Sequence, residues 1–119
     1  MSCILHLNTS LSQVVWQKTY DNPASNAIYT ISVSKDHDEG FIICGQTDVQ
    51  YAYVLKTDSL CKVLWSKSFG NSNEWNVAMG VQPTSDKGCI VVGASEFYKG
   101  YLYVLRLDIN GNIVWAKAY

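Results

Sequence analysis

A tryptophan recurs at a nearly constant interval along this chain. Trp16, Trp65 and Trp115 are separated by 49 and 50 residues, and they stand in the similar stretches QVVWQKTY, KVLWSKSF and NIVWAKAY. A period of this length is typical of an array of supersecondary units, each about 20 to 50 residues long. We therefore expect the 119 residues to form about two such units, with the three tryptophans as structural residues that fill the seams between units.

The similarity extends over the whole interval and is not limited to the tryptophans. Between segments 51–69 and 101–119, seven of the nineteen aligned residues are identical. Upstream of these, DEGFIICGQT (38–47) aligns with DKGCIVVGAS (86–95). The repeat thus fills its period, and each copy is expected to contain a complete set of secondary-structure elements.

Each copy divides into four strand-like runs, a to d. Run a, AIYTISVS (27–34) or VAMGVQ (77–82), alternates apolar residues with smaller or polar ones, which is the period of a β-strand. Run b, FIICG or CIVVG, is apolar throughout, which predicts a strand buried between two layers. Runs c and d, YAYVLK with KVLWSKSF or YLYVLRL with NIVWAKAY, are joined in the second copy by DINGN, whose Asn-Gly pair favours a tight hairpin.

Four antiparallel strands repeated at about 50 residues predict an all-β chain built of β-propeller blades. The order of the runs predicts an amino-terminal half blade (strands c and d) over 1–20, a first complete blade over 21–69 and a second over 70–119. Propellers close with about four to eight blades. We therefore predict an incomplete propeller, which is either part of a longer polypeptide or assembles with other chains.

These motifs resemble a repeat found in bacterial and archaeal β-propellers, often in secreted or cell-surface proteins. The family unit runs D-G-G-x-x-x-x-G-x-T, then Y-x-x-K-x-D, then G-N-x-x-W-x-K-x-Y. The second copy matches it at Asp86 to Gly93, Tyr103 to Asp108 and Gly111 to Tyr119. The departures are Glu39 and Lys87 at the second glycine position, and 59–62 in place of the Gly-Asn hairpin. The resemblance implies a propeller fold and says little about activity, because propellers have many unrelated functions.

Composition and charge limit the classes of partner. A net charge of −1 provides no basic field for nucleic acid. Apolar runs such as YAYVL are far shorter than the roughly 20 residues of a membrane-spanning helix, so no membrane insertion is expected. The expected partners are other propeller blades, other protein chains, or a glycan.

The sequence predicts no catalytic, cofactor-binding or metal-binding residues. Cys3 and His6 are three residues apart, which on a strand places their side chains on opposite faces. The run 36–39 is interpreted as a solvated turn, and DINGN as an Asn-Gly hairpin and not a calcium loop. No serine or cysteine has a histidine partner in a suitable sequence context, so the chain is expected to be non-enzymatic.

Residues that depart from the repeat provide a candidate contact surface. Trp75 has no equivalent tryptophan in the first copy, and the loop with Phe97 and Tyr98 is two residues longer than its equivalent. Both loops are expected at the same end of a blade. The predicted interaction rim therefore comprises Asn71, Asn73, Trp75, Phe97 and Tyr98. Exposed aromatic residues anchor protein interfaces and sugar-binding surfaces; the alternative is that Trp75 packs at a junction between blades.

Two functions stay open at this stage. The first is a structural or protein-interaction module completed by further blades or other chains. The alternative is a fragment of a larger propeller enzyme, or of a carbohydrate-binding propeller, whose active residues lie outside this chain. The four cysteines do not match a disulfide framework and the start resembles no signal peptide, so a complete chain would be cytoplasmic. As part of a longer precursor it would be extracellular or at the cell surface, as the resemblance implies.

Overall fold

A computed structural model describes residues 3–5, 16–18, 28–70, 75–95 and 101–119. The strands are β1 (Cys3–Leu5), β2 (Trp16–Lys18), β3 (Ile28–Lys35), β4 (Phe41–Thr47), β5 (Ala52–Thr57), β6 (Val63–Phe69), β7 (Asn76–Pro83), β8 (Cys89–Ser95), β9 (Tyr101–Leu107) and β10 (Ile113–Ala118). No helix occurs among these residues, whether long and apolar enough to cross a membrane or shorter.

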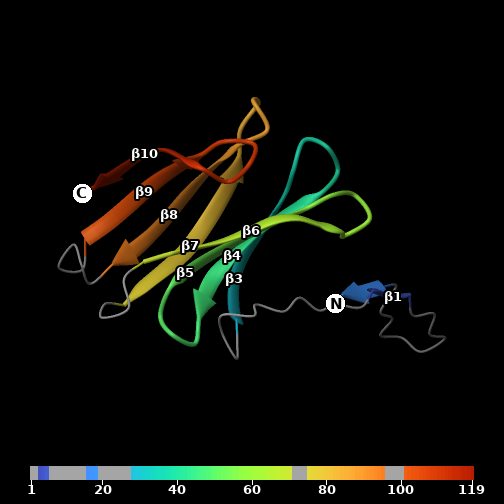
Figure 1. Ribbon diagram of the computed structural model, residues 1–119, viewed down its shortest axis with the longest axis horizontal. Coiled ribbons are helices and arrows are strands. Elements are labelled where there is room, and N and C mark those ends of the chain that lie inside the picture. Colours follow the sequence, from blue (N-terminus) through green and yellow to red (C-terminus); the bar gives the residue numbers. More distant parts are fainter. Residues whose placement is uncertain (1–2, 6–15, 19–27, 71–74, 96–100) are drawn as a thin grey trace.

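The strands form three antiparallel sheets (Figure 1). Two of them have four strands. We call the one with the order β3-β4-β5-β6 the first sheet and the one with the order β7-β8-β9-β10 the second sheet. The short strands β1 and β2 pair with each other, with Cys3 opposite Lys18. The prediction of an all-β chain with two four-stranded antiparallel units is therefore confirmed. The arrangement of these units as propeller blades, and the half blade over 1–20, stay predictions.

The two four-stranded sheets have irregularities at equivalent positions. Between the first and second strands, the register shifts at Ile31 in the first sheet and at Met79 in the second. Between the third and fourth strands, it shifts at Leu64 and at Val114. A bulge adds one residue and increases the local twist of its strand. The two sheets therefore deform at the same two places.

The turns between the third and fourth strands also match, although their sequences differ. Asp58 and Asp108 each accept hydrogen bonds at 2.8–2.9 Å from the backbone N–H groups two and four residues further on. The third residue after each aspartate has a positive φ, which is 63° at Cys61 and 80° at Gly111. The departure from the family motif at 59–62 therefore changes the side chains of this turn and leaves its type unchanged.

The hydrophobic core lies between the two four-stranded sheets. One side of it is the docking face of the first sheet, which consists of Ile42, Cys44, Val54, Lys56 and Trp65. The other side is the inner face of the second sheet, which consists of Cys89, Val91, Tyr103, Leu105 and Leu107. Strand β7 packs against β3, β4 and β5, as Figure 1 shows. Burial of apolar area in this layer favours the association of the two sheets.

The opposite face of the second sheet is its open face, and it includes Ile90, Val92, Val104, Arg106 and Trp115. Val92 is 36% exposed, and Leu102, at the end of the same face, is 49% exposed. Within the described residues, β8 is therefore buried on its inner face only, whereas β4 is mostly buried on both faces, as predicted for a strand between two layers. The difference arises because no described residue covers the open face of the second sheet.

Candidate functional site

The predicted interaction rim is represented in the structure by Trp75. This residue is 36% exposed and directly precedes β7. The backbone N–H of the next residue, Asn76, donates a hydrogen bond of 2.9 Å to the carbonyl of Gln50 in a turn of the first sheet. Trp75 therefore lies where the two sheets meet. The other predicted rim residues, Asn71, Asn73, Phe97 and Tyr98, lie outside the described residues.

The surroundings of the described cysteines and carboxylates change the pKa of several of them. Burial raises the pKa of the Cys44 and Cys89 thiols to about 11, so both are protonated at neutral pH. The Cys44 thiol donates to the carbonyl of Ala78 across the core at 3.6 Å. The backbone N–H of Asn112 lowers the pKa of Asp108. Among the described residues, no group of three or more His, Cys, Asp or Glu side chains is placed to hold a metal ion.

Trp65 connects the edge of the first sheet to a turn of the second. Its Nε1–H donates a hydrogen bond of 2.8 Å to the carbonyl of Ile109. The indole ring lies directly against Gly111, where an added Cβ would be only 2.8 Å from Trp65 Cε3 and 2.9 Å from Cδ2. Only a residue without a side chain leaves room for the ring in this position, and the φ of 80° at Gly111 also favours glycine.

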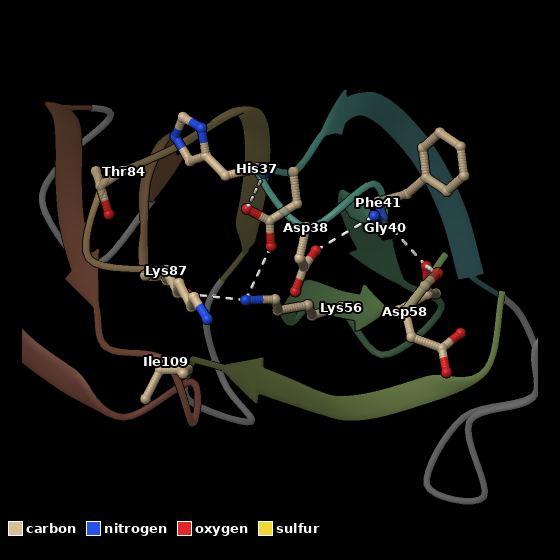
Figure 2. A network of polar contacts seen from close by, with 12 residues as sticks. His37, Asp38, Gly40, Phe41, Lys56, Asp58, Thr84, Lys87 and Ile109 are labelled. Carbon is tan, nitrogen blue, oxygen red and sulfur yellow. Dashed lines mark hydrogen bonds and ion pairs between the residues drawn. The ribbon is translucent and has the colours of Figure 1, made fainter. Parts of the chain in front are cut away.

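Lys56 makes a second polar connection, inside the layer between the sheets. Its side chain is 2% exposed, and its Nζ lies 2.8 Å from the carboxylate of Asp36, which is 1% exposed. The same Nζ donates a hydrogen bond of 2.8 Å to the backbone carbonyl of Lys87 in the second sheet. Figure 2 shows Lys56 lying between its own sheet and the turn that holds Lys87. A buried ammonium is tolerated because its partners replace the lost water.

The open face of the second sheet has comparable residues at comparable positions. Trp115 lies opposite Arg106 across β9 and β10, as Trp65 lies opposite Lys56 across β5 and β6. Arg106 forms an ion pair with Asp86 of its own sheet, and its side chain is 21% exposed. Trp115 is 40% exposed, and the group recorded over its ring is Lys117 of its own strand, whose Nζ lies 5.5 Å from the ring centroid, whereas the ring of Trp65 lies against a turn of the other sheet.

Sequence reasoning did not select Lys56 or Arg106 as site residues. It placed Asp36 in a solvated turn, which is wrong for this residue, because its side chain is 1% exposed and pairs with Lys56. A signal was present, because Lys56 and Arg106 occupy the same place in the repeat and interrupt otherwise apolar runs. A charged residue that recurs on the apolar side of a strand requires a partner when it is covered. The sequence contained no information on which of the two copies is covered.

The two tryptophans provide a matched pair for mutation. Trp65→Phe is expected to lower the free energy of unfolding by about 1–2 kcal/mol, because it removes a hydrogen bond and part of the ring contact between the sheets. Trp115→Phe is expected to change it by less than about 0.5 kcal/mol, because Trp115 is 40% exposed and its recorded ring contact is with Lys117 of its own strand. Urea denaturation of both variants at one protein concentration measures the difference. Equal losses would contradict the assignment of Trp65 as the tryptophan that joins the sheets.

Comparison with protein-family models and with curated proteins finds no match to this chain.

Proposed function

We propose that this chain is a non-enzymatic β-propeller segment, which serves as a structural or protein-interaction module and is completed by further blades or other chains. One observation supports this proposal above the others. The open face of the second sheet carries Trp115 and Arg106 at the positions where the first sheet uses Trp65 and Lys56 to hold its neighbour. A surface built like an internal interface is suited to binding a similar unit.

The proposed arrangement is one in which each sheet stacks on the next in the same direction. The docking face of the first sheet contacts the inner face of the second, and these are different surfaces. Such a head-to-tail contact generates a ring when the rotation from one unit to the next adds up to a full turn. Otherwise it generates an open array. The ring corresponds to a propeller, in which Trp75 belongs to the rim proposed as the contact surface for protein or glycan.

Native mass spectrometry of the protein isolated from its source cells, with every subunit identified, tests this function. We expect these residues either within a polypeptide longer than 119 residues or in a complex heavier than 13.3 kDa. The physical reason is that a repeat unit buries its second face only against a neighbour. A folded monomer of 13.3 kDa would contradict the proposal.

A further inference from the structure

The open face of the second sheet repeats the composition of the docking face of the first sheet. Ile90, Val92, Val104, Arg106 and Trp115 stand at the positions of Ile42, Cys44, Val54, Lys56 and Trp65. On the first sheet this face is covered, and Ile42 and Val54 are both fully buried. The inner face of the second sheet covers the docking face of the first. It therefore indicates what kind of surface would fit the open face.

We propose that the open face docks one further four-stranded antiparallel unit that has a glycine of positive φ in the turn between its third and fourth strands. This inference rests on the proposed function and specifies the partner that the function requires. Three features define that partner: an apolar inner face, a backbone carbonyl in the turn that receives the Trp115 Nε1–H, and a second turn carbonyl that faces Arg106.

The requirement for glycine follows from the contact between Trp65 and Gly111. The Trp65 indole reaches the carbonyl of Ile109 only by lying against Gly111, at a distance that excludes a Cβ. Trp115 has the same ring on the same face of its sheet. For Trp115 to make the equivalent hydrogen bond, the turn that covers it needs the same open space.

The same geometry argues against a second copy of this chain as the occupant. A second copy would have to present the face of its first sheet that carries Tyr53 and Leu55, which are already only 4% and 2% exposed, and the equivalent turn there has Cys61 in place of glycine. Cys61 has the required positive φ, 63°, but its Cβ and thiol would occupy the space of the Trp115 ring. The open face is therefore matched to a unit that resembles the second sheet of this chain and not the first.

Arg106 provides the polar part of the recognition. In the first sheet, Lys56 contacts an acidic residue of its own sheet and, at the same time, the carbonyl of Lys87. Arg106 already forms the first of these contacts, through Nη2 to Asp86. A guanidinium has five N–H donors, so Arg106 retains donors for a carbonyl of the incoming turn. The docked unit would complete this pair of contacts.

The test adds a third unit to the full chain. A second copy of residues 70–119 is joined after Tyr119, which places a glycine-containing turn next to the open face, and the control extension carries Gly111→Cys in the added copy only. Hydrogen exchange of the tryptophan indole N–H groups is then followed by NMR, with the Trp115 signal assigned from Trp115→Phe. The Trp65 indole N–H serves as the internal reference for an intact interface.

In the glycine-containing extension, we expect exchange at the Trp115 indole to slow by about tenfold or more relative to the parent chain. In the Gly111→Cys extension, the rate should stay at the parent value. An unchanged rate in the glycine-containing extension overturns the docking, whether the added unit is unfolded or unattached. Equal slowing in both extensions overturns the glycine requirement, and slowing in the concentrated parent chain alone overturns the exclusion of a second copy. None of these results depends on the native mass, so failure of this inference is distinguishable from failure of the proposed function.

Discussion

Replacement of Lys56 with methionine is expected to lower the free energy of unfolding by about 3–5 kcal/mol, the usual cost of removing one partner of a buried ion pair. The side chains of Lys56 and Asp36 are 2% and 1% exposed, so no water reaches the carboxylate that the variant leaves behind. The carbonyl of Lys87 loses its hydrogen-bond donor in the same step. Methionine fills a similar volume, so the loss measures the polar contacts and not a cavity.

The chain contains a matched control for this variant. Arg106 occupies the equivalent strand position on the open face, where its partner Asp86 is 59% exposed. Arg106→Met is therefore expected to change the free energy of unfolding by less than about 1 kcal/mol. Urea denaturation of both variants provides the comparison. Similar losses in the two would show that the ion pair of Lys56 is not desolvated as described.

A double variant separates the charge from the packing. Lys56→Met combined with Asp36→Asn removes both charges and leaves a neutral amide at position 36. We expect the double variant to be more stable than Lys56→Met alone, because its cost no longer includes an unpaired buried charge. The single variants Lys56→Met and Asp36→Asn are measured beside it. If the double variant loses as much free energy of unfolding as the two single variants together, the two side chains are not directly coupled.

The strands and turns could be predicted from the sequence because their determinants are local. The alternation predicts run a over 27–34, and β3 covers Ile28–Lys35. The Asn-Gly pair of DINGN predicts a tight turn, and Gly111 has the positive φ that this turn needs. Alternation and turn chemistry depend on neighbours in sequence, which a single chain displays directly.

The burial of individual residues could not be predicted, because it depends on what packs against each sheet. Lys56 and Arg106 have nearly identical sequence surroundings, yet one is fully buried and the other reaches the surface. Trp65 and Trp115 differ in the same way, since only Trp65 has a turn of another sheet against its ring. Similar local sequences therefore have different surroundings in the two sheets, and these surroundings decide the burial of each residue.

The second large effect is expected for Gly93→Ala, which should lower the free energy of unfolding by about 3 kcal/mol. A Cβ at this position would lie 2.1 Å from the carbonyl oxygen of Val77 and 2.4 Å from Tyr103 Oη. Tyr103 Oη donates a hydrogen bond of 2.8 Å to that same carbonyl, and both groups are buried. The added methyl group would therefore separate β7 from β8 or displace the tyrosine, and each leaves a buried polar group without its partner.

Gly80→Ala is the matched control, in the same sheet and one strand away. A Cβ at Gly80 would meet only Val92 Cγ2, at 3.2 Å, and the first sheet already has a side chain at the equivalent position, Ser32. We expect a change of less than about 1 kcal/mol, because replacing glycine with alanine at an unstrained position also restricts the unfolded chain. Thermal or urea unfolding of both variants measures the contrast. If Gly93→Ala proved as mild as Gly80→Ala, the close approach of β7, β8 and Tyr103 in the core would be wrong.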